Sequence, residues 1–303
     1  MNNWIILALL APALYSLVVF VDKYLVSNQV KDYRSLPIFA GIMGTICGSI
    51  IWFFTGRPLL NLFDAIIALV TGFLTIISFI PYYKSVTLEE PSKINIYFQL
   101  APLLILLLSW LILGDKITVN HLVGFIFIIL SVIIISLKKN KTFKKFTFSK
   151  ALYFVLIYNL LVAISAILVK FTLNFNNLSS ILSYPSWGAG VGALVLYLFS
   201  RDIRIAFHQN ITTLKIKTIT VMLLNEGLFI LARTITYAAY SIGSVSLISA
   251  LEGTQVFYGI FFGWFFTRLF PSLVKENISR KNIALKIFAS IILIIGIYFI
   301  TIV

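Results

Sequence analysis

Charged side chains inside long apolar stretches are the residues best suited to chemistry in this sequence. Glu226 and Arg233 lie seven residues apart in one such stretch, a spacing of two helical turns, and Glu252 lies in the next. An ionisable group at the centre of a bilayer costs at least about 2.5 kcal/mol, so it normally faces a cavity or a charged partner. Arginine binds carboxylates and phosphates as a planar fork, whereas a carboxylate can bind an ammonium group. The three residues therefore predict a polar binding site.

Tyrosine and amide side chains extend this site along the same helix faces. Tyr237 and Tyr240 follow Arg233 at helical spacing, and Gln255 follows Glu252 by three residues. Aromatic faces add cation–π contacts to a bound ammonium group. Carboxylates that are removed from water generally bind protons more tightly, which makes the proton a candidate coupling ion.

Two further regions could complete the wall of the site. Asn95 and Gln99 form a polar stripe in an earlier apolar stretch, and Trp187 precedes a glycine-rich segment. A polar stripe on a membrane helix turns toward protein or water, so we expect these side chains to converge with the charged ones. The candidate substrate-binding residues are Glu226, Arg233, Tyr237, Tyr240, Glu252, Gln255, Gln99, Asn95 and Trp187.

Several of these residues also have a purely structural interpretation. Arg233 could pair with Glu226 or Glu252 and fasten helices together. The Asn95 and Gln99 stripe could form hydrogen bonds between helices, and Trp187 could pack or anchor at the bilayer interface.

Other charged residues are expected to act at helix ends. Asp22 and Lys23 close the first apolar stretch, where long side chains reach toward the interface. Asp115 and Glu276 each precede a helix, where a carboxylate caps free backbone N–H groups.

The composition requires a membrane to hold these residues in place. Of the 303 residues, 60% are hydrophobic and only 11% are charged, whereas about a quarter of a soluble domain is charged. A bilayer-spanning helix needs roughly 20 apolar residues. The sequence predicts an all-α integral membrane protein with ten transmembrane helices near residues 3–22, 36–55, 62–83, 94–113, 119–137, 151–171, 180–200, 216–240, 243–267 and 283–302.

The basic residues orient these helices. The formal net charge is +14, and most of the 24 Lys and Arg residues lie at connections that follow odd-numbered helices. Positively charged loops stay cytoplasmic. We therefore expect a multi-pass protein of the cytoplasmic membrane with its odd-numbered loops inside and both termini outside.

The remaining chemistry-bearing residue types are scarce. The single cysteine, Cys47, permits no internal disulfide, and the two histidines fall near helix ends. No HExxH, Gly-x-Ser-x-Gly or nucleotide-binding loop is present in the sequence. We expect no enzyme activity, no cofactor, no metal site and no nucleic-acid partner.

The two halves of the chain resemble each other. Residues 20–25, Phe-Val-Asp-Lys-Tyr-Leu, match residues 168–173, Leu-Val-Lys-Phe-Thr-Leu. Because five is an odd number, a second copy of five helices enters the membrane inverted, an arrangement typical of secondary transporters with a midplane site. The predicted organisation is a five-helix repeat at 1–137, a basic cytoplasmic linker at 138–150 and a second five-helix repeat at 151–303.

Together, the ten helices, the Asp22-Lys23 ending and the turn Gly114-Asp115-Lys116-Ile117-Thr118 resemble the drug/metabolite transporter superfamily, specifically its EamA-type members. The resemblance covers almost the whole chain. It implies a carrier of small metabolites without an ATPase domain. It also implies a cavity lined chiefly by helices 1, 3, 4, 6, 8 and 9.

The leading interpretation is a secondary transporter that moves a small polar metabolite by alternating access. A zwitterion such as an amino acid would satisfy Arg233 and the carboxylates at once. The alternative within transport is a cation or quaternary-amine carrier in which Arg233 is structural. A lipid-linked substrate would need a lateral gate, and a non-transporting membrane scaffold could use the same polar residues.

Overall fold

Ten long apolar helices form the body of the computed structural model, which describes residues 3–114, 116–139 and 146–301. Each is long and apolar enough to cross a bilayer, so the chain is a multi-pass, all-α membrane protein. The spans are Ile5–Gln29, Tyr33–Phe54, Leu62–Leu88, Pro91–Leu113, Val119–Ser136, Lys150–Leu173, Leu178–Phe199, Ile216–Ile242, Val245–Leu269 and Arg280–Ile300. The predicted fold class is confirmed.

The helical elements differ from the spans where a turn interrupts or extends a helix. They are α1 (Asn3–Tyr24), η1 (Leu25–Gln29), η2 (Tyr33–Ser35), α2 (Leu36–Phe54), α3 (Leu62–Leu88), α4 (Pro91–Tyr97), η3 (Phe98–Leu100), α5 (Ala101–Leu113), α6 (Val119–Ser136), α7 (Lys150–Leu173), α8 (Leu178–Phe199), α9 (Arg201–Ile211), α10 (Ile216–Ile242), α11 (Val245–Leu251), η4 (Glu252–Thr254), α12 (Gln255–Leu269) and α13 (Arg280–Thr301).

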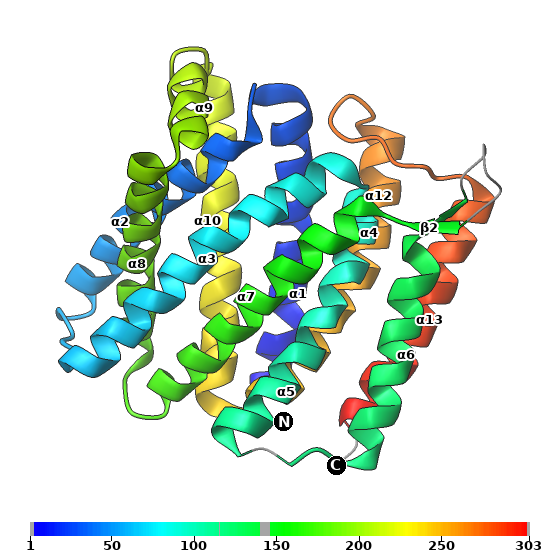
Figure 1. Cartoon of the computed structure of the whole chain (residues 1–303), viewed down its shortest axis with the longest axis horizontal. Coiled ribbons are helices and arrows are strands. Elements are labelled where there is room, and N and C mark those ends of the chain that lie inside the picture. The colour runs from blue at the N-terminus through cyan, green and yellow to red at the C-terminus, as the bar shows by residue number, and fades with distance from the viewer. Residues whose placement is uncertain (1–2, 115, 140–145, 302–303) are drawn as a thin grey trace.

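Helices of the first half of the chain pack against helices of the second half. The main contacts join α1 to α10, α3 to α7, α2 to α8 and α6 to α13. Both chain ends lie at the lower side of the molecule in Figure 1, whereas α9 and β2 lie at the upper side. We call these two sides the termini face and the hairpin face.

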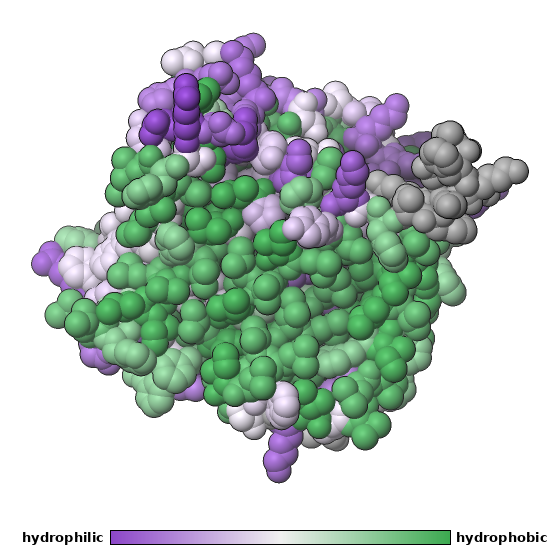
Figure 2. Space-filling model, in the orientation of Figure 1, coloured by the Kyte–Doolittle hydropathy of each residue, from purple (hydrophilic) through white to green (hydrophobic). Residues whose placement is uncertain are grey.

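The surface agrees with this division. Figure 2 shows an apolar belt around the middle of the molecule, with hydrophilic residues gathered mainly at the hairpin face. The basic connections after odd-numbered spans lie at that face, and they are the ones expected in the cytoplasm.

The connection between the halves contains two short strands. The sequence predicts a basic linker at 138–150, and within it β1 (Leu137–Lys139) pairs antiparallel with β2 (Phe146–Phe148). Leu137 lies opposite Phe148, so apolar residues close the pair beside the membrane. Ser149 then accepts a hydrogen bond from the Ala151 backbone N–H and caps α7.

Spans 4 and 9 are predicted from the sequence as continuous helices, but in the structure each is interrupted about a third of the way along. Each begins with seven α-helical residues, passes through a three-residue 3-10 turn (η3 or η4) and resumes as α5 or α12. Pro102 has no N–H and its ring crowds the carbonyl four residues earlier, which explains the break at Phe98–Leu100. Gly253 weakens the second helix, and a Cβ there would overlap Ile297.

Glycines bring α3 and α8 into close contact. A Cβ on Gly72 would overlap the Pro185 carbonyl, and one on Gly188 would overlap the Leu69 carbonyl. Only glycine allows backbones to approach this closely in a membrane. The two helices therefore form a tight seam between the halves.

Two lysines occupy matching positions in the halves. Lys23 Nζ donates to the carbonyl oxygens of Val86 (2.7 Å) and Glu89 (3.1 Å) at the end of α3. Lys170 Nζ donates to those of Tyr240 (2.8 Å) and Gly243 (3.0 Å) at the end of α10. A cation at a helix C-terminus satisfies free carbonyls and opposes the helix dipole. This correspondence supports the predicted inverted repeat, and it replaces the expectation that Lys23 reaches to the interface.

Candidate functional site

A cavity of about 170 Å³ lies between the two halves of the molecule. Its walls come from α1, α3, η3 with α5, α7, α10 and the broken span made of α11, η4 and α12. These are helices 1, 3, 4, 6, 8 and 9 of the ten spans, the set that the family resemblance implies. The breaks in spans 4 and 9 both border the cavity, so two 3-10 turns face it instead of regular helix.

The structure brings seven of the nine candidate residues to this cavity. The seven lining residues are Glu226, Arg233, Tyr237, Tyr240, Glu252, Gln255 and Gln99. The first four share one face of α10, as the spacing predicts. Asn95 and Trp187 are not among the lining residues.

Arg233 is buried at 6% exposure and is held by a neutral neighbour. Its Nη2 donates to Ser186 Oγ at 2.7 Å, and its guanidinium carbon lies 6.0 Å from the centre of the Phe229 ring. Its Nε has no hydrogen-bond partner. Within the described part of the chain, no ion pair joins Arg233 to Glu226 or Glu252. The guanidinium can therefore accept a further anionic partner.

The two glutamates predicted from sequence face the same cavity. Glu252 lies in η4, and its Oε1 accepts a hydrogen bond from Thr236 Oγ1 at 3.0 Å. Glu226 lies on α10 and also lines the cavity. Both carboxyl groups keep oxygen atoms available for a donor, so the cavity can bind a cationic group.

Asn95 lies behind the wall and positions it. Its Nδ2 donates to Ser16 Oγ (2.8 Å), while its Oδ1 accepts from Gln255 Nε2 (3.0 Å). Gln99 Nε2 donates to the Asn95 carbonyl (3.1 Å). Gly259 makes room for this side chain, because a Cβ there would lie 2.5 Å from Asn95 Nδ2. The interhelical interpretation thus describes Asn95, which orients two amides that do line the cavity.

Trp187 lies in a different region from the one expected. Its Nε1 donates to Ser49 Oγ at 3.0 Å, and its ring contacts Trp52 and Tyr184. These partners place it at the α2–α8 contact near the termini face. The structural interpretation of Trp187 describes its position better than a role in the cavity wall.

Asp22 lines the cavity, although its position in the sequence predicts that it lies at the end of the first helix. It is 2% exposed, and its carboxylate accepts from Tyr82 Oη at 2.5 Å and from Asn225 Nδ2 at 2.8 Å. The first span is Ile5–Gln29 and continues through the π-helical turn η1, so Asp22 lies within the span and not at its end. It joins α1 to both α3 and α10 instead of marking the rim.

Aromatic rings form a second feature that the polar stripes do not reveal. Tyr82 contacts Tyr158 (5.4 Å between ring centres) and Phe98 (6.0 Å), and Phe229 contacts Phe79 (5.4 Å) and Tyr15 (5.9 Å). These rings come from α1, α3, η3, α7 and α10. They give the cavity aromatic faces that can stack on a flat group or contact an ammonium.

The two carboxylates predicted to cap helices, Asp115 and Glu276, have different outcomes in the structure. Asp115 lies outside the described residues. Glu276 does not cap the helix that follows it, because its carboxylate accepts from Ser92 and Lys286. Across residues 3–114, 116–139 and 146–301 there is no group of three or more His, Cys, Asp or Glu that could hold a metal ion.

Ten spans surround a polar cavity that both halves line. The sequence model of the EamA-like transporter family matches residues 2–137, so the first half of the chain is similar to this family of membrane transporters. The whole chain is similar in fold to a crystal structure described only as that of a protein, with 14% identity, 99% of each chain covered and a TM-score of 0.65. None of the curated proteins matches this chain.

Proposed function

We propose that the chain is a secondary transporter that moves a small zwitterionic or amino-acid-like solute across the cytoplasmic membrane by alternating access. The observation that carries this proposal is one cavity in which Arg233 and two glutamates are not paired with each other. Buried charges are normally paired. A solute that brings both signs would pair them when it binds.

The position of the cavity supports the carrier mechanism. It lies between two halves whose lysine contacts and helix breaks match, which is the usual place for a transporter site. Following the charge bias, the hairpin face is assigned to the cytoplasm and the termini face to the outside. The charged pocket also offers carboxylates that could exchange protons, so the proton remains the proposed coupling ion.

A cation carrier is the second candidate, and the aromatic cluster around Tyr82 and Phe229 favours it. In that case the ammonium group would contact the rings and Glu226 or Glu252, and Arg233 would only brace α10 against Ser186 on α8. The two candidates differ in their need for the guanidinium.

The test is counterflow transport in liposomes by the purified protein, with amino acids and quaternary amines as separate substrate panels. Arg233→Gln should lower transport of a zwitterion by about tenfold or more, equivalent to about 1.4 kcal/mol, whereas Arg233→Lys retains part of it. Glu252→Gln should lower transport of either class. Cation transport that survives Arg233→Gln would select the second candidate.

Ligand binding gives an independent control. A ligand present at 100 times its dissociation constant stabilises the protein by about 2.7 kcal/mol, and thermal unfolding in detergent measures this. If no panel member stabilises the protein or is transported, while both variants alone unfold at lower temperature, a scaffold is the better description.

A further inference from the structure

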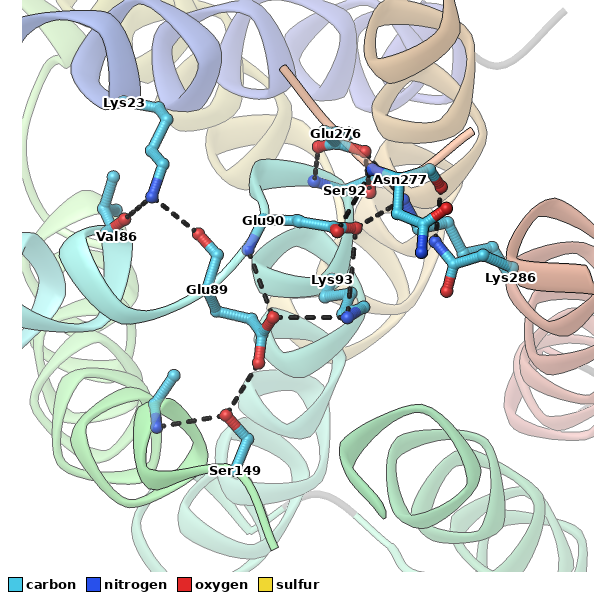
Figure 3. Close-up of polar contacts among 12 residues, drawn as sticks. Lys23, Val86, Glu89, Glu90, Ser92, Lys93, Ser149, Glu276, Asn277 and Lys286 are labelled. Carbon is cyan, nitrogen blue, oxygen red and sulfur yellow. Dashed lines mark hydrogen bonds and ion pairs between the residues drawn. The ribbon is translucent and has the colours of Figure 1, made fainter. Parts of the chain in front are cut away.

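A buried cluster of polar residues joins the two halves at the hairpin face. Glu276 Oε1 accepts from the Ser92 backbone N–H (2.9 Å), and its Oε2 accepts from Ser92 Oγ (2.5 Å) and Lys286 Nζ (2.7 Å). Lys286 also pairs with Glu90 (2.8 Å), and Glu90 Oε1 accepts from the Asn277 backbone N–H (3.2 Å). Figure 3 shows these contacts together. We call Glu90, Ser92, Glu276, Asn277 and Lys286 the inter-half latch.

The latch is assembled from both halves of the chain. Glu90 and Ser92 lie at the α3–α4 connection in the first half, whereas Glu276, Asn277 and Lys286 lie on the α12–α13 connection and α13 in the second. Lys286 and Glu276 are only 3% and 5% exposed. Lys286 thus lies inside a membrane helix, α13.

Burial gives the latch two distinct states. A buried ion pair adds little net stability over apolar side chains, but a single unpaired member is strongly unfavourable. The latch is therefore either fully made or released into water, because intermediate geometries leave a charge unpaired. Such an element separates two conformations sharply.

The surroundings provide room for both states. A Cβ on Gly263 would lie 2.6 Å from Glu276 Oε2, so glycine at this position lets the carboxylate sit against α12. On its other side, Glu276 and Lys286 border a small apolar cavity of about 200 Å³ that includes Trp264 and Ile283.

Two consecutive residues connect the latch to the substrate cavity. Asp22 lines the cavity, while Lys23 donates to the carbonyl oxygens of Val86 and Glu89. Glu89 directly precedes Glu90, and its carboxylate accepts from Ser149 at the start of α7. A shift of α1 at Asp22 is therefore transmitted through Lys23 to the α3–α4 connection that carries the latch.

Two charged residues of the latch have uncharged counterparts in the opposite half of the chain. Counted from the acidic residue that precedes each last helix, Lys286 corresponds to Phe125. Counted from the starts of α4 and α11, Glu90 corresponds to Ser244. The Lys286–Glu90 ion pair therefore has no equivalent at Phe125 and Ser244.

We propose that the inter-half latch is the gate of the hairpin face, closed in this conformation and released when the cavity opens to that side. The proposal rests on the transport function proposed above. It assigns to Lys286 and Glu276 a gating role, separate from the residues that contact the solute.

Thiol labelling tests the gate without any substrate. In a Cys47→Ala background, which removes the only native thiol, single cysteines replace Val19 or Ile105, both of which line the cavity. Val19 lies one turn before Asp22, in the half of α1 that ends at the hairpin face, and Ile105 lies in α5, which leads to the termini face. The protein is placed in lipid nanodiscs and exposed to a water-soluble thiol reagent.

Lys286→Gln should raise the labelling rate at position 19 by about tenfold or more, because it removes the positive partner of Glu276 and leaves Glu90 with only the longer Lys93 pair (3.9 Å) in the closed state. Labelling at position 105 should fall, since the two faces open in alternation. The matched control is Lys93→Gln. Lys93 pairs with Glu89 and Glu90 within the first half, so its loss leaves the contacts between the halves intact and both rates near those of the background protein.

A milder variant keeps the test usable if Lys286→Gln does not fold. Ser92→Ala removes one hydrogen bond to Glu276 and preserves every charge, so it should change both rates in the same directions by a smaller factor. Unchanged rates, or equal increases at both positions, would overturn the gate. Because no substrate enters this assay, a protein that fails to transport can still pass it, and one that transports can still fail it.

Discussion

The third helix of each half, α3 or α10, makes the same lysine contact at its end but carries different residues along its length. Aligned on their lysine contacts, Val86 of α3 corresponds to Tyr240 of α10. By this alignment Gly72 of α3 corresponds to Glu226 of α10, and Phe79 corresponds to Arg233. The first copy thus carries a glycine and a ring where the second carries two charges.

The environments of the two helices explain this difference. Gly72 is pressed against the Pro185 carbonyl, so α3 forms a close seam with α8. α10 touches α2 at few points, and it is the least buried of the ten spans in the described chain. A helix packed closely against its neighbour has no space for long polar side chains. A helix with fewer close contacts can direct such side chains toward a cavity. One copy seals the interface, and the other supplies charged groups to the cavity.

The largest effect is expected from a change that breaks the seam. Gly72→Ala introduces a Cβ that overlaps the Pro185 carbonyl and should lower the free energy of unfolding by about 3 kcal/mol, since overpacking against backbone is costly. Gly227→Ala on α10 is the matched control, because nothing lies within 4 Å of a Cβ there. It should cause no loss. Denaturation by SDS in mixed micelles measures both variants, and equal losses would contradict the proposed asymmetry.

An intermediate effect is expected from the lysines that the two copies share. Lys23→Met and Lys170→Met each remove charge-assisted hydrogen bonds to carbonyl oxygens at a helix end, so each should cost about 2 kcal/mol. Lys84→Met, which removes a contact with the Tyr33 ring and an electrostatic attraction to Asp32, should cost less than about 1 kcal/mol. The same denaturation assay applies. A neutral result for only one of the first two variants would show that the lysine contacts are not equivalent.

The smallest effect is expected outside the cavity. Trp187→Phe removes the hydrogen bond to Ser49, which should lower stability by about 1 kcal/mol and leave transport nearly unchanged. If the folded variant loses transport, α8 contributes to the site and the division between a sealing copy and a binding copy is wrong.

The sequence determines the membrane fold and the charged face of α10 with little ambiguity. Apolar stretches of about 20 residues have few alternatives to a spanning helix. If residues 226–233 form a helix, the seven-residue spacing of Glu226 and Arg233 puts both on the same face. The structure places both at the cavity.

Depth and partner choice are harder to predict from the same pattern. Asp22 stands beside Lys23, which suggests an interfacial pair, but η1 extends the span to Gln29 and buries the carboxylate. Lys286 lies close to a run of basic residues, so its ion pair with Glu90, almost 200 positions away, leaves no local signal. The amphipathic Trp187 side chain suits either a cavity wall or a contact between helices, and its position depends on which helix packs beside it.

The sparse protein cover of α10 has a consequence for the lipid environment. Because acyl chains, and not another helix, flank much of this span, lateral pressure in the hydrocarbon region bears directly on the helix that holds Glu226 and Arg233. The turnover of the carrier should therefore vary with chain saturation and bilayer thickness even when headgroup charge is constant. The bilayer then contributes to the mechanical stiffness of α10 and of the cavity that α10 lines, and the phospholipid composition of the cell determines part of that stiffness.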